Sequence, residues 1–531
     1  MYKVGLISLV LFIAIVNWIW LTLDTEPVWW DQANYLNTSL HYAQGFKSLN
    51  IRGFINSIIT FNPIRPPVPM LMAAPIYFFN YREEDVAVML NVLYLAIAFI
   101  AIFKICKEYL NSKASLMCCF LLFMFPFVFG LSRQFMIDIC LLSAVTVSIL
   151  LLLKCDYFKS FKFSFLLGIV LGIGMLIKIV YINFLVGPLV YVICKSPIFS
   201  AIFKKNNSVT KIQLVPSYRV WRNFLSCLLA ALVLTAIWYL PNLKNTIFLV
   251  LQCGYNKISM GARGNLLGLN SLLLYPRALM NYGISFIFTV LFLISCIFFF
   301  KRKGHTTLKV MFSAWILFPL LFFTFSQTND ERYLLPLAPA VAIITGCGIY
   351  LIHNKSLKFS LIIVTAILGL LQFFAYSFNV PLLSQFINKR LVYKNIVFFD
   401  SNRIGCSRSY PQNIKSHIDD IFYAIRNDVK LSNDICRILL LSDHCTYNAN
   451  TLGYYANKAK LNFSILIAHG GDLLSFMSDN RYQYVIYKDQ FASPYPYFIN
   501  KFKQAKIFID SHPEDFKIIY KVGDIIVYRH I

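Results

Sequence analysis

The chain has 531 residues, of which 58 % are hydrophobic and only 14 % are charged, and its formal net charge is +25. A soluble globular protein carries about 25 % charged residues, so this composition predicts a polytopic membrane protein. Apolar runs of membrane length interrupt the basic residues, and no motif that reads RNA or DNA accompanies them, which excludes a nucleic-acid partner. The thirteen cysteines show no CxxC or Cys/His ligand spacing, and we interpret them mostly as small buried apolar residues.

The first apolar segment, residues 4–23, has the length of about 20 residues that a helix needs to cross a bilayer. The LTLDTEPVWW sequence at its end offers no small-residue cleavage site, so we expect an anchor and not a cleaved signal peptide. Further apolar spans bring the expected number of transmembrane helices to about eleven: residues 86–106, 116–131, 135–153, 163–177, 179–194, 224–240, 282–300, 310–325, 334–351 and 360–378.

The segments that connect successive spans alternate in charge. Segments rich in Lys and Arg alternate with segments that hold Asp31, Asp330 and Glu331. By the positive-inside rule the amino terminus is cytoplasmic and the acidic connections lie outside. Lys178 separates two short apolar runs, and reading them as one helix would turn the later basic connections outward, which favours a pair of helices. We expect a transmembrane domain over residues 1–378, whose first outer loop is residues 24–85.

The composition changes after residue 378. Short strand-like runs such as ICRILLLSD, YQYVIYKD and FKIIYKV alternate with polar and helical stretches. This pattern predicts a small extracytoplasmic α/β domain over residues 379–531. No GxGxxG follows the ILLLSD run, so a nucleotide-binding site is not indicated there. The topology fits a multi-pass protein of a bacterial inner membrane with a periplasmic active face, and an endoplasmic reticulum membrane would obey the same rule.

Ionisable residues near the ends of the spans carry the functional information, because a charge near lipid is costly and usually faces an interior cavity. Asp31 follows the first span in the motif WWDQANY. Its alternative role is to cap a surface helix, with the tryptophans as interfacial anchors. Arg65 precedes the prolines of RPPVPML, which hold it near the interface. A guanidinium suits phosphate, and the alternative is that Arg65 reaches lipid headgroups.

Four more candidate residues fall on the same predicted face. Asp138 lies about one turn inside its span, where it needs a metal or a cationic partner such as Arg133. Lys178 ends the GIGMLIK helix, and Arg332 and Tyr333 follow Glu331 in NDERYLLPLAP. Transfer of a group from a lipid-linked phosphate requires a base and cations that stabilise the departing phosphate. Because these residues share the outer face of the membrane, the sequence predicts transfer of a group from a lipid-linked phosphate there.

The order of these motifs resembles that of a known family. WWDQANY, IRPPVPML, RQFMIDICL, GIGMLIKIV, IWYLPN and RYLLPLAP follow one another as in the C-type membrane glycosyltransferases (GT-C fold), and most closely in the protein mannosyltransferase and aminoarabinose transferase superfamily. The resemblance covers roughly residues 1–350. It implies inverting transfer of a sugar from a polyprenyl-phosphate donor to an extracytoplasmic lipid, glycan or protein acceptor.

The resemblance also implies roles for individual residues. It makes Asp31 the catalytic base, and the positions similar to donor-phosphate contacts are Arg65, Lys178, Arg332 and Tyr333. Substrate or metal binding is implied for Asp138, Gln32 and Tyr35. The family commonly has Asp-Glu where this chain has Asp31-Gln32, so a second carboxylate is missing there. Some relatives use a divalent metal ion, but no ligand set in this sequence requires one, and His41 is only a candidate contributor.

Other functions remain as alternatives. A lipid-linked oligosaccharide polymerase or ligase shares the donor chemistry. A transporter or flippase would place its charges nearer the bilayer midplane, at the interface of structural repeats. A non-catalytic assembly protein would explain the spans but gives no reason for an aspartate and three cations at one level.

Overall fold

The computed structural model describes residues 2–47, 50–79, 81–197, 217–255, 268–327, 330–378, 380, 391–393, 396–399, 410–428, 435–466, 482–488 and 496–531. The chain divides into two compact units. The helical unit contains Met1–Leu21, Ile55–Met72 and Val88–Tyr410. The sheet unit contains Thr22–Phe54, Ala73–Ala87 and Pro411–Ile531.

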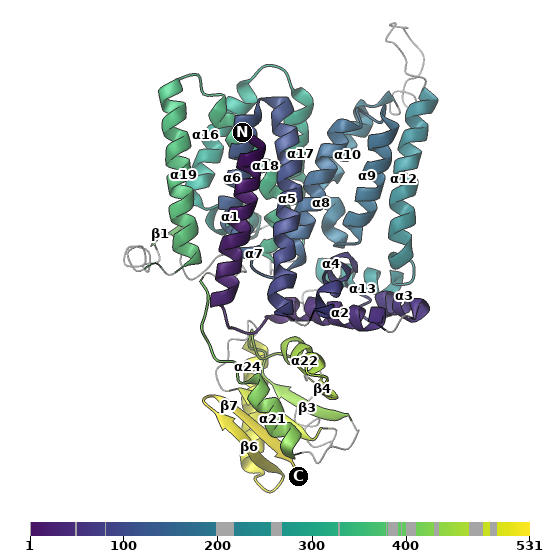
Figure 1. Cartoon of the computed structure of the whole chain (residues 1–531), viewed down its shortest axis with the longest axis vertical. Coiled ribbons are helices and arrows are strands. Elements are labelled where there is room, and N and C mark those ends of the chain that lie inside the picture. Colours follow the sequence, from purple (N-terminus) through teal and green to yellow (C-terminus); the bar gives the residue numbers. More distant parts are fainter. Residues whose placement is uncertain are drawn as a thin grey trace. The chain divides into compact units, whose positions relative to one another are not determined.

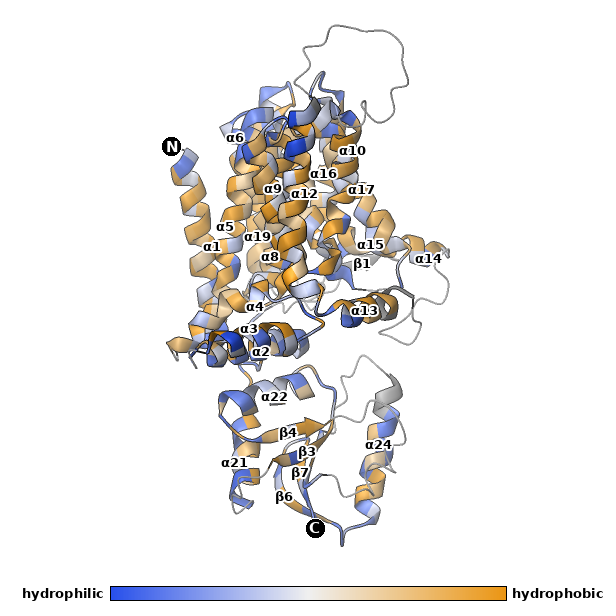
Figure 2. Cartoon of the chain, turned by 90° about the vertical axis from the view of Figure 1, so that its right-hand side faces the viewer, coloured by the Kyte–Doolittle hydropathy of each residue, from blue (hydrophilic) through white to orange (hydrophobic). Residues whose placement is uncertain are grey.

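Long apolar helices that run side by side build the helical unit, as Figure 1 shows. They are α1 (Tyr2–Leu23), α5 (Glu83–Tyr109), α6 (Ser112–Met124), α7 (Pro126–Leu131), α8 (Ile137–Lys154), α9 (Phe161–Met175), α10 (Val186–Lys195), α12 (Ser217–Tyr239), α16 (Phe286–Lys301), α17 (Thr306–Thr324), α18 (Ala338–Tyr350) and α19 (Lys355–Ser377). Figure 2 shows that hydrophobic residues make up most of these helices, and many of their large apolar side chains are exposed. This surface suits a lipid environment.

Shorter elements connect these helices. They are α3 (Ile51–Thr60), α4 (Val68–Ala73), η2 (Ile179–Phe184), α13 (Leu243–Tyr255), α14 (Leu269–Leu272), α15 (Leu274–Ala278), η3 (Leu279–Gly283), η4 (Glu331–Leu337) and the antiparallel pair β1 (Leu391–Tyr393) and β2 (Ile396–Phe399). Element η2 begins directly after the candidate residue Lys178, and η4 contains the candidate residues Arg332 and Tyr333.

Each predicted span coincides with one or two helical elements, several of which are short. Residues 116–131 fall on α6 and α7, and residues 179–194 fall on η2 and α10. Within the described residues, seven helices are long and apolar enough to cross a membrane, or eight if the bent pair Leu274–Gly283 and Phe286–Lys301 forms one span. The bend in that pair is 109°. Pro126, at the start of α7, separates α7 from α6 because its ring and its missing N–H are incompatible with a helix interior. The number of eleven crossings stays a prediction.

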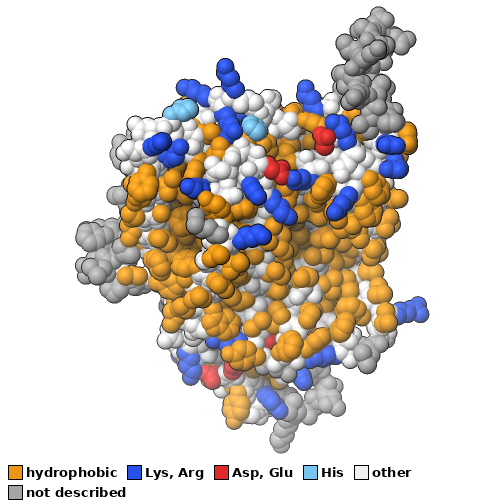
Figure 3. All heavy atoms as spheres, turned by 45° about the horizontal axis from the view of Figure 1, so that its top comes forward, with side chains coloured by type: hydrophobic (Ala, Val, Ile, Leu, Met, Phe, Trp, Pro, Cys, Tyr) orange, Lys and Arg blue, Asp and Glu red, His pale blue; other side chains and the backbone are white. Residues whose placement is uncertain are grey.

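Basic side chains gather at one end of the helical unit. Figure 3 shows Lys and Arg there, beside a belt of hydrophobic side chains. Exposed lysines of this kind occur near the end of α5, at the start of α6 and between α16 and α17: Lys104, Lys107, Lys113, Lys301 and Lys303. This distribution agrees with the charge pattern from which the positive-inside prediction was made.

The sheet unit has a mixed five-stranded sheet of order β4-β3-β5-β7-β6. Its elements are α2 (Trp30–Lys47), η1 (Ala74–Phe78), α21 (Ile418–Asp428), β3 (Cys436–Leu441), α22 (Ala449–Lys458), β4 (Phe463–Leu466), β5 (Tyr484–Lys488), α24 (Pro496–Ser511), β6 (Phe516–Val522) and β7 (Ile525–His530). Strand β3 is parallel to β4 and β5, whereas β7 is antiparallel to β5 and β6. The predicted α/β fold of the C-terminal region is therefore confirmed, whereas its boundary at residue 379 and its extracytoplasmic position stay predictions.

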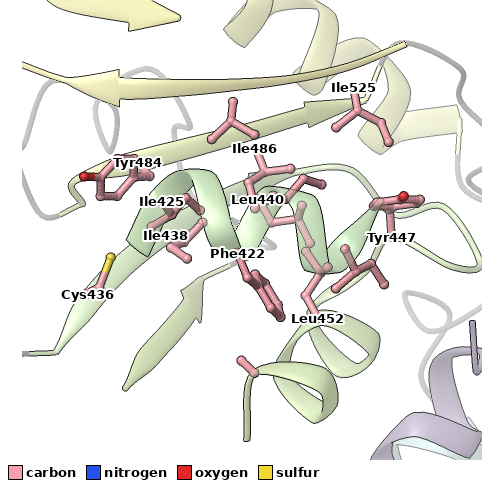
Figure 4. Close-up of a cluster of buried hydrophobic side chains, with 14 residues drawn as sticks. Phe422, Ile425, Cys436, Ile438, Leu440, Tyr447, Leu452, Tyr484, Ile486 and Ile525 are labelled. Atoms are coloured by element: carbon pink, nitrogen blue, oxygen red, sulfur yellow. The ribbon is translucent and has the colours of Figure 1, made fainter. Parts of the chain in front are cut away.

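Strand β3 is buried on both faces. Ile438 and Leu440 belong to one core cluster, with residues of α21 and α22, and Figure 4 shows their side chains there. Leu439 and Leu441 belong to a second cluster, with residues of α24. Because successive side chains of a strand point to opposite faces, a strand covered on both sides is apolar throughout. This explains the uninterrupted ILLL sequence.

The predicted outer loop is a structured part of the sheet unit. Helix α2 packs on α22. Thr451 Oγ1 donates to the carbonyl oxygen of Val28 at 2.9 Å, and Lys458 Nζ lies 2.7 Å from a carboxylate oxygen of Glu84. Residues 22–54 and 73–87 therefore fold with the C-terminal sheet, although hundreds of residues separate them along the chain.

Helices α9 and α12 pack closely because glycines line the contact. A Cβ atom on Gly168 would lie 2.2 Å from the carbonyl oxygen of Cys227. We expect Gly168→Ala to lower the free energy of unfolding by about 1–3 kcal/mol, the usual cost of overpacking. Thermal unfolding of the purified protein measures this change. Gly453→Ala is the control because no atom lies within 4 Å of its Cβ position, and equal stability losses in the two variants would contradict the packing argument.

Candidate functional site

Lys178 lies at a break in the helical path. Helix α9 ends at Met175, and η2 begins at Ile179 after Lys178 in an extended conformation. Gly174 permits this turn because a Cβ atom there would lie 2.2 Å from the ring of Tyr181. The amide of Val68 donates to the carbonyl oxygen of Leu176 at 3.1 Å. The double-proline segment therefore lies against the end of the GIGMLIK helix.

A buried ion pair joins Lys178 to Asp138. Lys178 Nζ donates to Asp138 Oδ1 at 2.9 Å, and the two side chains are 12 % and 1 % exposed. Asp138 lies in the first turn of α8, where the helix dipole favours a carboxylate. Within the described part of the chain, Asp138 Oδ2 has no hydrogen-bond partner. The ammonium also lies 4.4 Å from the ring centroid of Tyr333, so the charge of Lys178 is held by a carboxylate and an aromatic face.

A second ion pair lies beside the first. Arg332 Nε lies 3.0 and 2.9 Å from the two carboxylate oxygens of Asp330, and Arg332 Nη2 donates to Oδ2 at 2.6 Å. Burial by itself raises the pKa of Asp330. The charge and hydrogen bonds of Arg332, with the charge of Lys178, outweigh burial and lower the pKa to about 2. Asp330 is therefore ionised at neutral pH.

We call Asp138, Lys178, Asp330, Arg332 and Tyr333 the charged cluster. Its two cations and two carboxylates form two ion pairs, so their formal charges balance. Sequence reasoning placed Asp330 in an outer connection but did not assign it to the site. The two-residue spacing to Arg332 was the available signal, because Asp330 also caps η4 by accepting from the Arg332 amide.

Arg133 is not the partner of Asp138. Its side chain is 2 % exposed, and its Nη2 donates to Ser377 Oγ at 2.7 Å. Its Nε donates to Asn17 Oδ1 at 3.4 Å. Aromatic rings surround the guanidinium at 5.1–5.9 Å: Trp20, Phe129, Phe373 and Phe378. Arg133 therefore links α1, α7 and α19, and the alternative pairing with Asp138 was wrong.

Arg65 lies in the helical unit, in the turn before α4. Its side chain is half-buried, whereas Pro66 and Pro67 are buried. Its amide donates to the carbonyl oxygen of Asn62 at 3.2 Å. The prolines thus form a rigid connection from this turn into α4, and the role of Arg65 at a donor phosphate stays a prediction.

Asp31, Gln32 and Tyr35 lie in the sheet unit, on α2. Asp31 is half-buried in the first turn of the helix, and Gln32 and Tyr35 are buried. Trp30 Nε1 donates to Asp443 Oδ1 at 3.2 Å, which attaches the start of α2 to the end of β3. A first-turn aspartate interacts favourably with the helix dipole. The position of Asp31 is therefore compatible with both the structural and the catalytic interpretation. That Asp31 acts together with Arg65, Lys178 and Arg332 stays a prediction.

The candidate metal contributor His41 is half-buried in α2, and burial lowers the pKa of its imidazole. A neutral imidazole is the form that binds metals. Among the residues that the structure describes, however, His41 and the carboxylates form no group of three metal-ligating side chains. A contribution of His41 to metal binding therefore stays a prediction.

The buried ion pair predicts strong coupling in a double-mutant cycle. Asp138→Asn or Lys178→Met leaves one buried charge without its partner, and we expect each to cost about 3–5 kcal/mol. Because the double variant removes both charges, it should cost much less than the sum. Thermal unfolding of the four proteins measures the coupling.

The exposed pair Asp156 and Lys159 is the control for that cycle. Its atoms lie 3.2 Å apart, but the side chains are 58 % and 42 % exposed. Solvent screening should reduce its coupling to about 0–1 kcal/mol. Similar coupling energies in the two cycles would contradict the buried pair.

Asp330 predicts a pH dependence of stability. Its pKa falls from 3.8 to about 2 on folding, so the folded state binds fewer protons than the unfolded state between these values. The ionised group then contributes roughly 2 kcal/mol above about pH 4. We expect the difference in stability between wild type and Asp330→Asn to be constant near neutral pH and to shrink as pH falls below about 4. A difference that already disappears near pH 6 would rule out this pKa shift.

A comparison with known protein families covers part of the candidate residues. The sequence model of the family described as dolichyl-phosphate-mannose-protein mannosyltransferase matches residues 64–221. This segment includes Arg65, Asp138 and Lys178, whereas Asp31 and Arg332 lie outside it. No curated protein matches the sequence significantly.

Two solved structures are similar in fold over nearly the whole chain. ArnT from Cupriavidus metallidurans bound to undecaprenyl phosphate has 13 % identity and a TM-score of 0.59, covering 99 % of this chain and 98 % of that one. The same protein in its apo state has 13 % identity and a TM-score of 0.59, covering 100 % and 99 %. Identity at this level shows the fold alone. The fold and the sequence pattern of residues 64–221 together confirm the resemblance of this chain to the C-type membrane glycosyltransferases of the protein mannosyltransferase and aminoarabinose transferase superfamily.

Proposed function

We propose that this protein is a membrane glycosyltransferase that moves a sugar from a polyprenyl-phosphate donor to an extracytoplasmic lipid, glycan or protein. The observation that carries the proposal is the charged cluster. It joins residues from three of the motifs that define the resemblance, in a unit built from apolar helices. The undecaprenyl phosphate bound to the similar ArnT structure supports this class of donor.

The paired cations can still contact a phosphate. A lysine ammonium has three N–H donors, and Asp138 accepts from Nζ at 2.9 Å. The guanidinium of Arg332 has five donors in a planar fork, and the described bonds to Asp330 involve Nε and Nη2. Because the carboxylates fix the positions of both cations, little reorganisation accompanies phosphate binding. Asp138 and Asp330 thus act as positioning residues.

In the proposed reaction Asp31 accepts the proton of an acceptor hydroxyl. The acceptor oxygen forms a bond to the anomeric carbon on the face opposite the lipid phosphate, and the bond from that carbon to the phosphate oxygen breaks. The configuration is therefore inverted. The negative charge of the departing polyprenyl phosphate is stabilised by Arg65, Lys178 and Arg332, with Tyr333 beside Lys178.

The lipid donor suits a protein whose surface is dominated by apolar helices, since its polyprenyl tail partitions into the bilayer while its phosphate stays at the interface. The gathering of basic side chains at one end of the helical unit supports a cytoplasmic position for that end. We therefore place the reaction at the opposite, periplasmic face of the inner membrane.

Asp31→Asn tests the proposed base. Membranes that contain the variant are incubated with radiolabelled polyprenyl-phosphate sugars, and label is measured in lipid, glycan and protein fractions. Because an amide does not accept a proton from a hydroxyl, we expect transfer to fall by about 10²–10⁴-fold. The control is Glu26→Gln, which removes a carboxylate from the same segment.

Intact transfer in Asp31→Asn would exclude Asp31 as the base. Label that appears only in lengthened lipid-linked glycans would support the polymerase alternative. Label that crosses the membrane on unchanged donor, with no acceptor product, would support a flippase.

A further inference from the structure

Three cysteine side chains meet inside the helical unit. Cys106 comes from α5, Cys118 from α6 and Cys347 from α18, and their sulfur atoms all lie within 4.8 Å of one another. All three residues are fully buried, at 0 % exposure. Within the described residues they form the one group of three or more side chains with metal-ligand geometry. The proposed glycosyl transfer makes no use of them.

Helix packing brings the sulfur atoms together. Helices α6 and α18 pack against each other at Gly346, where a Cβ atom would lie 2.5 Å from Cys118 Sγ. Only glycine leaves room for the sulfur at this point. Cys118 Sγ also lies 3.7 Å from the carbonyl oxygen of Ile343. In the alternative interpretation, the cysteines are only small residues that allow close helix contact, and the tests below separate the two.

The separations suit a soft metal ion. With metal–sulfur bonds of about 2.3 Å, three thiolates around one ion lie about 4 Å apart, so small side-chain movements would bring the observed atoms into range. Thiolate sulfur selects Cu(I) and Zn(II) over hard cations. The helix ends near the cluster adjoin the basic connections, which the positive-inside rule assigns to the cytoplasm. In that reducing compartment the thiols stay available as ligands.

A cation lies beside the cluster. The guanidinium of Arg302 lies 4.8 Å from the ring centroid of Tyr109, which follows Cys106 by three residues on α5. Its Nη1 is buried and has no hydrogen-bond acceptor among the described residues. Three thiolates around Zn(II) carry one net negative charge, and a nearby guanidinium offsets that charge.

We propose that Cys106, Cys118 and Cys347 form a binding site for one soft metal ion, Cu(I) or Zn(II), inside the helical unit. Binding replaces the thiol protons with bonds from sulfur to the metal and releases those protons to solvent. The bound ion ties α5, α6 and α18 together near the helix ends that adjoin the basic connections. The site thereby stabilises the helix bundle.

Metal loading of the full-length protein tests the proposal. Purified, reduced protein in detergent is loaded anaerobically with Cu(I) or Zn(II) in separate arms, passed over a chelator and analysed for metal content. We expect one ion per chain in at least one arm, and a loss of at least tenfold in affinity in Cys118→Ser and Cys347→Ser. The matched control is Cys119→Ser, because Cys119 is equally buried on the same helix but contacts Phe99. Equal loading of Cys118→Ser and Cys119→Ser, or no retained metal in either arm, would overturn the site.

X-ray absorption of the loaded wild type gives an answer without any variant. A first shell of three sulfur atoms at about 2.3 Å supports the cysteine site. A shell of nitrogen or oxygen alone refutes it. The two loading arms identify which ion the site prefers.

Discussion

The buried ion pair between Asp138 and Lys178 is the constraint on which the charged cluster depends. Two charges enclosed in an apolar helical unit are tolerated only with good geometry and partners. The break after α9, the glycine under the ring of Tyr181 and the start of α8 all serve this geometry. Tyr333 extends the arrangement to η4, because its ring lies beside Lys178 and stacks on Phe323.

Arg133, the other buried cation near the start of α8, is stabilised without a carboxylate among its described partners. Arg133 is as deeply buried as Asp138, but its described partners are neutral oxygens and aromatic rings. Asn91 Nδ2 donates to the carbonyl oxygens of Ser132 and Gln134 in the same connection. These contacts order the connection between α7 and α8, and so they determine where α8 begins and where Asp138 lies.

The WWDQANY motif belongs to another part of the molecule. Helix α2 has no strongly apolar face of its own, and its buried residues pack on α22 and η1. The hydrogen bond from Trp30 to Asp443 attaches the segment before Asp31 to the end of β3. The C-terminal sheet therefore supports the helix that carries the proposed base, which gives this small domain a structural role.

Local patterns determined the class of fold. The apolar runs predicted the helices, and the strand-like runs predicted the C-terminal sheet, because both signals depend on spacing within a few residues. The motifs also indicated Asp138, Lys178, Arg332 and Tyr333, since ionisable groups are rare in membrane-spanning sequence. Only the tertiary structure decided the partners. Asp138 could pair with Arg133 or Lys178 by charge alone, but Arg133 binds Asn17 and Ser377, and Lys178 is the partner. The cysteines of α5, α6 and α18 show no ligand spacing in sequence, and helix packing alone brings their sulfur atoms together.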